Sequence, residues 1–350
     1  MAKRDLVVIG GSAGSIGPLR TILSAMPAQL PAAIAVVLHI PSDSTGIFNT
    51  VAAAAGALPV HAATEGMMLE HGHVYLGTPN HHLVIQDGAL RLGSGPRENL
   101  VRPAIDPLFR SAAASHGPRA IGVILSGMLN DGADGLRAIK RCGGVALVQS
   151  PHDSAASEMP LAALEATAVD LSTEASHLGP AILRHLDETA EPVVPVERDI
   201  LIEIEIALGS RYDSRIAAEI SKPVALTCPD CGGVLSQIEA ARPLRFRCQV
   251  GHGYTARTLL HEKEGSVDEA VRVALRIVEE RAELVGRMGR DASQAGRIGM
   301  AEMYEGRAAE YRRYAETLRH AVLKTLATEP PPDDDHLTHT QIIGPIPEEE

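Results

Sequence analysis

The chain has 350 residues, of which 45% are hydrophobic and only 3% aromatic, and its formal net charge is −12. This length exceeds one ordinary domain core, so two or three domains are expected. The acidic excess argues against sequence-independent binding to nucleic acid or to an anionic membrane. No run approaches the roughly 18 apolar residues of a membrane span, and no signal-peptide pattern opens the chain, so we expect a cytoplasmic protein without membrane insertion.

A short apolar run near the start of the chain ends in a glycine-serine motif. Leu6–Ile9 is followed directly by Gly10-Gly11-Ser12-Ala13-Gly14 and then by a helical pattern. This order is typical of a nucleophile elbow, where glycines permit a sharp turn that exposes the serine hydroxyl. Ser12 is therefore a candidate nucleophile. Dinucleotide and P-loop phosphate binding are not supported, because the motif fits neither G-x-G-x-x-G nor a Walker lysine pattern.

Up to about residue 188, apolar runs alternate with helical patterns, which predicts an α/β fold with a doubly wound, mostly parallel sheet. The expected strands are Leu6–Ile9, Ile34–His39, Val74–Leu76, Leu83–Ile85, Ile121–Leu125 and Val145–Gln149. The expected helices lie near Pro18–Met26, Gly46–Ala55, Pro107–Ser115 and Ala133–Cys142. Asp106 should cap the third helix, with Pro107 at its first position. Residues 57–95 break the rhythm, and the turn Asp87-Gly88 predicts a β-hairpin excursion at the sheet's edge.

Two further polar residues follow predicted strands. His39 ends the run Ala35–Leu38, and Asp131 comes shortly after Ile121–Leu125. The carboxyl ends of parallel strands share one edge, so both side chains can converge there with Ser12. A nucleophilic serine needs a base, and the base needs an orienting carboxylate. Each residue alone is weak evidence, since a strand-end histidine is often structural and Asp131 could simply cap the next helix. Together the three favour acyl transfer.

Several blocks of the sequence resemble the signatures of chemotaxis protein-glutamate methylesterases of the CheB type. The three main blocks are Gly10–Gly14, His39–Pro41 and Gly127–Ala133, and two further blocks are Tyr75–Leu83 and Arg102–Asp106. The resemblance covers about residues 5 to 185, the catalytic domain of that family. The family usually has Ser-Thr-Gly-Gly where this chain has Ser12-Ala13-Gly14-Ser15. It also commonly carries an N-terminal receiver domain, which we expect to be absent here, and the C-terminal extension is not constant in it.

The resemblance implies hydrolysis of glutamyl methyl esters on chemoreceptors, with release of methanol, and deamidation of glutamines as a further activity. It implies that Ser12 is the nucleophile, His39 the general base and Asp131 the orienting carboxylate, with no cofactor for catalysis. The backbone N–H of Met128 is a candidate oxyanion donor. Arg102 is a candidate anchor for the substrate, although an arginine before a helix is often only part of a surface ion pair.

A second interpretation remains open. The departures at Ala13 and Ser15 favour a weakly active or inactive methylesterase-like adaptor that acts through its C-terminal part. The retained serine, histidine and aspartate favour the enzyme. The neighbouring His81 and His82 lie in a turn-rich segment and are expected to be exposed to solvent.

Three of the four cysteines cluster in the C-terminal half. With a histidine they form the pattern C-x₂-C-x₁₆-C-x₃-H, made by Cys228, Cys231, Cys248 and His252. Two such knuckles can complete a tetrahedron, which predicts a zinc-ribbon-like unit with a structural zinc ion and strands at Gly233–Ile238 and Leu244–Arg247. A ribbon that folds without metal is the alternative, and a thioredoxin-like pair lacks its strand–helix context. Four arginines should make the unit locally basic: Arg242, Arg245, Arg247 and Arg257.

The remaining segments suggest a linker, a helical region and a tail. Thr189–Arg198 carries two prolines and reads as a linker before a short helix. Residues 257–328 carry apolar residues at three- and four-residue steps, which predicts a helical hairpin turning near Asp291–Ile298. It should pack on itself, on its twin in a homodimer, or on a partner. The acidic, proline-rich tail should be disordered. The predicted divisions are 1–188, 189–221, 222–256, 257–328 and 329–350.

Overall fold

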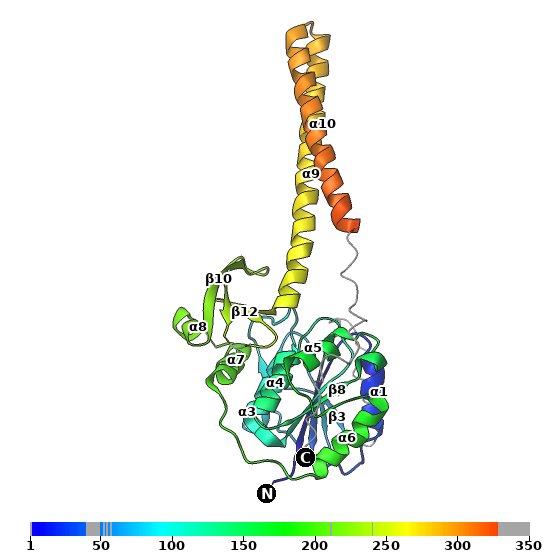
Figure 1. Ribbon diagram of the computed structural model, residues 1–350, viewed down its shortest axis with the longest axis vertical. Coiled ribbons are helices and arrows are strands. Elements are labelled where there is room, and N and C mark those ends of the chain that lie inside the picture. Colours follow the sequence, from blue (N-terminus) through cyan, green and yellow to red (C-terminus); the bar gives the residue numbers. More distant parts are fainter. Residues whose placement is uncertain are drawn as a thin grey trace, which may run out of the picture. The chain divides into compact units, whose positions relative to one another are not determined.

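Figure 1 shows the fold in a computed structural model. The structure describes residues 2–39, 50, 51, 53, 55, 56, 58–210, 212–239 and 241–327. These residues belong to two compact units, Met1–His261 and Glu262–Glu350. The helix expected at Gly46–Ala55 lies largely outside the described residues, as does Ile40-Pro41 of the second family block, and the tail expected to be disordered at 329–350 lies wholly outside them.

The first unit is built on a seven-stranded parallel sheet with the strand order β3-β4-β2-β1-β7-β8-β9. Its strands are β1 (Leu6–Gly11), β2 (Ala33–Leu38), β3 (Val60–Ala62), β4 (Val74–Leu76), β7 (Ala120–Ile124), β8 (Val145–Gln149) and β9 (Leu171–Thr173). The flanking helices are α1 (Ile16–Ser24), α3 (Ile105–His116), α4 (Ala133–Arg141), α5 (Glu158–Ala166) and α6 (Ala175–Asp187). Single 3₁₀ turns lie at Gly117–Arg119 and Pro151–Asp153.

Both faces of this sheet are buried, as the continuous apolar strands require. In β1, Leu6 and Val8 belong to one core cluster, while Val7 and Ile9 belong to another on the opposite face. Helices α3 and α4 pack on the first face, and α1 and α6 on the second (Figure 1). This arrangement confirms the predicted doubly wound α/β fold.

Only part of the segment between residues 57 and 95 leaves the main sheet. Strands β5 (His82–Gln86) and β6 (Ala89–Gly93) form the predicted antiparallel hairpin. Its turn uses Asp87 and Gly88, whose φ angles are 52° and 76°, as a two-residue type I′ connection requires. Strands β3 and β4, in contrast, extend the parallel sheet. The strand predicted at Val74–Leu76 is confirmed as β4, whereas β3, only three residues long, was missed because so short a segment has no clear periodic signal.

The cysteine-bearing segment forms a separate antiparallel sheet in the same unit, which we call the ribbon. Its strands are β10 (Ser221–Thr227), β11 (Val234–Ile238), β12 (Arg245–Cys248) and β13 (Gly253–Thr255), in that spatial order. Before it come α7 (Arg198–Leu208) and α8 (Ser214–Ile220). In α7, Ile200 and Ile204 join the core cluster on the α3 face. The ribbon therefore follows a helix that is part of the main core.

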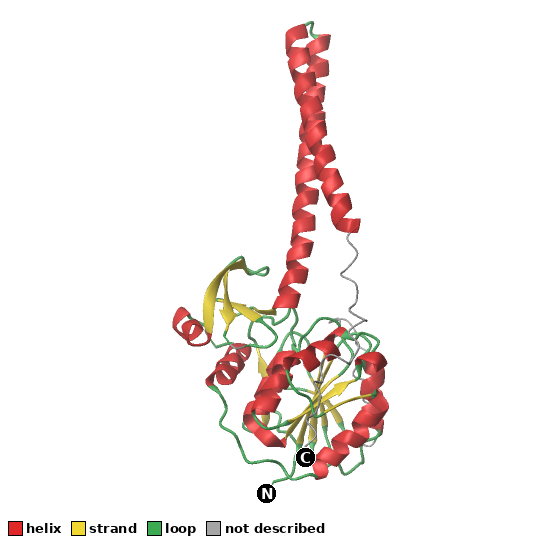
Figure 2. Ribbon diagram, viewed as in Figure 1, coloured by secondary structure: helices red, strands yellow, loops and turns green. Residues whose placement is uncertain are grey.

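The predicted helical hairpin is confirmed by α9 (Ala256–Gln294) and α10 (Ile298–Ala327), which run antiparallel in Figure 2. Among the described residues, the apolar side chains that the second unit buries are all alanines: Ala282, Ala292, Ala301, Ala308 and Ala315. The larger apolar residues of α9, such as Val267 and Leu284, stay mostly exposed. Among the described residues, no helix combines the length and apolar character needed to cross a membrane.

Candidate active site and metal centre

Ser12 lies in the sharp turn between β1 and α1. Its backbone N–H donates to Ser126 O at 2.9 Å, and the Ser15 N–H donates back to Ser12 O at 3.1 Å. The Ser15 hydroxyl donates to the same carbonyl at 2.6 Å, so this departure from the family pattern stabilises the turn. Gly14 has φ 76°, and a Cβ there would lie 2.5 Å from Ala155 Cβ. The glycine-rich sequence is therefore required by both conformation and space.

The register of the sheet places His39 beside Ser12. Gly11 at the end of β1 pairs with Leu38 at the end of β2. His39 directly follows Leu38, and its N–H donates to Gly11 O at 3.0 Å. The side chain of His39 is 13% exposed. No hydrogen bond joins Ser12 and His39, both of which the structure describes. Hydrogen bonds of catalytic groups are often long before substrate binds, so the arrangement is compatible with a nucleophile and its base.

His39 is held by Asp131, which lies 92 residues further along the chain. The His39 Nε2 and Asp131 Oδ2 atoms are 2.8 Å apart, and the Asp131 side chain is 3% exposed. Burial raises the pKa of Asp131, but the hydrogen bond and charge of His39, with donors from Ile105 and Asn99, outweigh burial and lower that pKa. An ionised carboxylate on Nε2 leaves Nδ1 as the ring nitrogen that can take a proton from serine.

Asp131 is anchored by the N-terminus of α3. Its Oδ2 accepts the Ile105 N–H at 2.6 Å, and its Oδ1 lies 3.4 Å from the Asp106 nitrogen. A Cβ on Gly10 would lie 2.3 Å from Ile105 Cγ2, and one on Gly132 would lie 2.8 Å from the same atom. These two glycines let α3 approach the loop closely. Anions are stabilised at helix N-termini, so α3 holds the carboxylate in its ionised form.

Asp106 does not cap α3, contrary to the sequence-based expectation. Its Oδ1 accepts the Gly135 N–H at 2.7 Å, and the capping carboxylate is that of Asp131. Burial and the negative charge of Asp131 raise the pKa of Asp106 well above its ordinary value. Of the two carboxyl groups, that of Asp131 is therefore favoured as the anion and that of Asp106 as the neutral acid. Local spacing could not reveal this, because the partners come from distant segments.

Asn99 is a further hydrogen-bond donor to the Asp131 carboxylate, and it was not predicted from the sequence. Its Nδ2 donates to Asp131 Oδ1 at 3.0 Å. Asn99 is 5% exposed and has a left-handed φ of 49°. No motif in the sequence indicates a role for Asn99. It lies three residues before Arg102, and this position does not predict a contact with Asp131.

The loop after β7 approaches the turn that holds Ser12 and carries the backbone amide of Met128. Gly127 N–H donates to Ala156 O at 3.0 Å, and Leu129 N–H donates to Glu158 Oε2 at 2.9 Å. Between them, the Met128 N–H has no partner among the described residues. A Cβ on Gly127 would lie 2.9 Å from Ser12 Cβ, which shows how closely the loop approaches the turn. The amide of Met128 is thus available to an oxyanion.

Arg102 contacts the β-hairpin, and His82 is buried where the sequence predicts exposure. Arg102 Nη1 donates to Gly95 O at 2.7 Å and to Ser94 O at 3.3 Å, so it binds the end of the β-hairpin. His82, expected to be solvated, is fully buried. Its Nε2 lies 2.9 Å from Pro96 O and its Nδ1 accepts the Ala104 N–H. Burial lowers the pKa of His82, consistent with a neutral ring that links the hairpin to α3.

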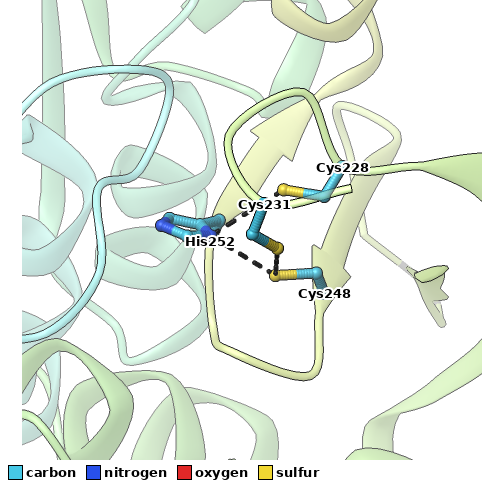
Figure 3. A group of neighbouring side chains, drawn as sticks. All are labelled: Cys228, Cys231, Cys248 and His252. Atoms are coloured by element: carbon cyan, nitrogen blue, oxygen red, sulfur yellow. Dashed lines mark hydrogen bonds between the residues drawn. The ribbon is translucent and has the colours of Figure 1, made fainter. Parts of the chain in front are cut away.

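The four predicted metal ligands come together in the ribbon (Figure 3). Their donor atoms all lie within 4.8 Å of one another. Cys231 Sγ is 3.7 Å from Cys248 Sγ, and His252 Nδ1 is 3.8 Å from Cys228 Sγ and 3.5 Å from Cys248 Sγ. Zinc–sulfur bonds of about 2.3 Å in a tetrahedron separate two sulfur atoms by about 3.8 Å. This Cys₃His group can therefore hold a metal ion, and its donors suit zinc.

The expectation of a basic ribbon surface is wrong for two of its arginines. Arg245 is 3% exposed and Arg247 is fully buried. They belong to a buried charge cluster that also contains Arg110 of α3, Asp134 of α4, Glu203 of α7 and Glu98. Burial raises the pKa of Glu203, but Arg245, Arg247 and Arg110 together lower it to about 2. These arginines neutralise acidic groups of the main core.

Comparisons with known proteins agree with this geometry. A family model described as CheB methylesterase matches residues 7–182. A Leptospira interrogans protein named putative protein-glutamate methylesterase/protein-glutamine glutaminase is 40% identical over 167 residues, which are 47% of this chain and 86% of that protein. Protein-glutamate methylesterase/protein-glutamine glutaminase 2 of Anaeromyxobacter dehalogenans is 41% identical over 169 residues, 48% of this chain and 50% of that protein. This chain thus matches half the length of the second relative.

The fold also resembles a solved structure. The crystal structure of the Thermotoga maritima CheB methylesterase catalytic domain matches 52% of this chain and 99% of that chain, with a TM-score of 0.50 and 28% sequence identity. The family match ends at residue 182, before the four metal-ligand candidates of the ribbon.

Proposed function

Because the chain belongs to the CheB methylesterase family, we propose that it hydrolyses γ-glutamyl methyl esters on a methyl-accepting chemoreceptor or a related signalling protein. The observation that carries the proposal is the 2.8 Å contact between His39 and Asp131, at the sheet edge where β1 presents Ser12. Hydrolysis converts the ester and water into a carboxylate, methanol and a proton. We expect the reaction to take place in the cytoplasm, where cysteines stay reduced.

In the proposed mechanism, Ser12 Oγ attacks the ester carbonyl while His39 Nδ1 takes its proton. Asp131 keeps the ring oriented and stabilises its protonated form. The amide of Met128 donates to the oxyanion, a contribution on the order of 3 kcal/mol to the transition state. The protonated His39 then gives its proton to the departing methoxide, which leaves as methanol. Water, activated by the same ring, hydrolyses the acyl-enzyme to the glutamate and restores the Ser12 hydroxyl.

The same groups support deamidation of a glutamine side chain. There the leaving group is ammonia, and the acyl-enzyme and its hydrolysis are identical. The adaptor alternative is not favoured, because the positioned histidine, the buried carboxylate and the free Met128 amide are all retained. The Arg102 side chain donates to the backbone carbonyls of Ser94 and Gly95, just after the β-hairpin. These contacts give little support to a direct role in substrate binding.

Methanol release from methylated receptor membranes tests the proposed activity. We expect release by the wild type and only background release by Ser12→Ala. Ser24→Ala is the matched control, because Ser24 lies on the exposed face of α1 and should leave the rate unchanged. Equal background release by the wild type and Ser12→Ala would contradict the enzyme and support the adaptor.

We further propose that Cys228, Cys231, Cys248 and His252 hold a structural zinc ion. All four tetrahedral positions are then filled by protein, so the ion would stabilise the ribbon without binding substrate. Elemental analysis of reduced protein should find about one zinc ion per chain, lost in Cys228→Ser. Cys142→Ala is the control that retains the ion, since Cys142 is buried in the core away from the group. Absence of metal from freshly purified protein would refute this assignment.

A further inference from the structure

The last strand of the ribbon contacts the residue that orients Asp131. Asn99 N–H donates to Gly253 O at 2.8 Å, and Thr255 N–H donates to Asn99 Oδ1 at 2.9 Å. The side-chain Nδ2 of Asn99 then donates to Asp131 Oδ1. One asparagine therefore joins β13 of the ribbon to the carboxylate that holds His39.

A second contact reaches the same loop from the ribbon. The Thr255 hydroxyl donates to Asn130 Oδ1, and the Thr258 hydroxyl lies 3.3 Å from that oxygen. Both threonines are fully buried, and Asn130 is 4% exposed. Because Asn130 directly precedes Asp131, Thr255 of the ribbon and Thr258 of α9 also hold the loop just before the carboxylate. Buried hydrogen bonds of this kind are costly to leave unmade.

The backbone around Asn99 needs external support. Asn99 and Leu100 both have left-handed φ angles, 49° and 71°. Such residues are strained and persist only where the surroundings determine their conformation. The support comes from β13 on one side and from the adjacent Glu98, which pairs with Arg247 of β12 at 3.0 Å.

The metal-ligand group lies next to this support. His252 directly precedes β13, and Cys248 ends β12. The Cys248 N–H donates to His252 O at 3.1 Å, so an ion bound by both side chains would close the β12–β13 connection. Without the ion, the end of this connection would keep only its backbone hydrogen bonds and the pairing of β12 with β13.

We infer that the ribbon is a positioning element of the ester-hydrolysing site, in which an ion on the Cys₃His group holds β13 and β13 holds Asn99 against Asp131. Asn99 is a positioning residue that acts through Asp131. The inference rests on the proposed hydrolase function and adds a dependence of its rate on the ribbon's metal. If Asn99 Nδ2 is removed, Asp131 Oδ1 keeps only the distant Asp106 N–H, and His39 loses its fixed orientation.

Four proteins test this inference: the wild type, Asn99→Ala, Cys228→Ser and the double variant. Misplacement of a catalytic group by about 1 Å can cost about 100-fold in rate, so we expect each single variant to lower kcat by about 10- to 100-fold with KM nearly unchanged. Asn99→Ala should retain the ion. Because both changes act on one pathway, the double variant should be no slower than the slower single variant. Losses that multiply, or an unchanged kcat in either single variant, would overturn the inference.

A proton NMR measurement decides the question without enzyme turnover. The ring N–H proton of His39 that faces Asp131 is assigned by its absence in His39→Gln. We expect its chemical shift to change in Asn99→Ala and in wild-type protein stripped of metal by a chelator. Lys222→Ala, which removes only an exposed ion pair with Glu239, should leave the shift, the metal content and kcat unchanged.

The two measurements separate the inference from the function on which it rests. If the wild type hydrolyses no faster than Ser12→Ala, the proposed function fails while the His39 signal still reports on the ribbon. If that signal is the same in wild type, Asn99→Ala and metal-stripped protein, the positioning role is wrong even where hydrolysis is present.

Discussion

At the scale of single residues, the site depends on close backbone approaches more than on unusual side chains. Gly10, Gly14, Gly127 and Gly132 each face an atom that a Cβ would meet at less than 3.0 Å. These approaches bring the turn at Ser12, the loop before Asp131 and the N-terminus of α3 into contact. The substitution of glycine by Ser15 in the family motif is accommodated because its hydroxyl binds the Ser12 carbonyl.

Asp131→Asn should leave the fold intact and disable the site. The carboxylate accepts at Oδ2 from Ile105 and His39 and at Oδ1 from Asn99, whereas an amide has only one oxygen. Its NH₂ group would face the Asn99 donor or His39, and facing His39 it would force the ring into the wrong tautomer. We expect kcat to fall by about 10³- to 10⁴-fold with little change in KM, measured as steady-state methanol release. Asp87→Asn is the matched control, because an exposed asparagine suits the left-handed turn position equally well. A variant Asp131→Asn with more than a tenth of wild-type kcat would argue against the proposed orienting role.

At the scale of elements, the buried charge cluster joins α3, α4, α7 and the ribbon. Arg245 forms ion pairs of 2.7 Å with Asp134 and 2.9 Å with Glu203, and all three side chains are at most 10% exposed. Removing Arg245 would leave three buried carboxylates, those of Glu98, Asp134 and Glu203, to share two arginines. The cluster therefore fixes how the ribbon meets the main sheet, although the family match ends before the ribbon.

Arg245→Met should destabilise the first unit by about 3–5 kcal/mol, because it leaves an uncompensated negative charge buried in the cluster. Arg276→Met is the control, since it breaks only an exposed pair with Glu280, worth about 0.5 kcal/mol. Urea unfolding followed by circular dichroism measures both. Equal midpoints for the two variants would show that the cluster contributes no more than a surface ion pair.

The cluster also predicts how stability depends on pH. The pKa of Glu203 falls from 4.5 to about 2 on folding, so the folded state holds this proton less tightly than the unfolded chain. Its contribution is therefore complete above about pH 4.5 and is lost as the pH falls towards 2. We expect the melting temperature to drop across this window in the wild type and to drop less steeply in Glu203→Gln, whose stability is lower at neutral pH. Parallel curves for the two proteins would contradict this assignment.

At the scale of the whole molecule, the two units are stabilised differently. The first has a large apolar core on each face of its sheet, whereas α9 and α10 bury mainly alanine. Ala301, Ala308 and Ala315 recur every seven residues, which lets the two helices approach closely along one face. The homodimer expected through this hairpin stays a prediction, and light scattering over a range of protein concentrations would test it.

Ala308→Leu should separate the two helices. Overpacking a close contact costs about 1–3 kcal/mol, so we expect the melting transition of the hairpin to occur at a lower temperature. Glu302→Leu places the same side chain at an exposed position of α10 and should change that transition little. A hairpin that melts at the wild-type temperature with leucine at position 308 would contradict the small-residue interface. Thermal circular dichroism at 222 nm, the standard helix wavelength, follows the transition.

Sequence alone determined those features whose information is local. Alternation of apolar runs and helical patterns gave the parallel sheet, the glycines around Ser12 gave the turn, and the spacing of three cysteines and His252 gave the ligand group. In each case the residues that make the feature lie close together in the chain, or in strands whose carboxyl ends share one edge by topology. These features can therefore be predicted without knowing which other parts of the chain pack against them.

Only the tertiary structure decided which distant groups satisfy one another. Asp131 caps a helix that begins 26 residues earlier, Asn99 pairs with Thr255 across 156 residues, and Arg245 neutralises Asp134 across 111 residues. A buried charge or amide must find a partner, but its own neighbours in the chain do not specify which one. For that reason the proposed triad of Ser12, His39 and Asp131 could be named from the sequence, while the contact of the ribbon with Asp131 through Asn99 could not.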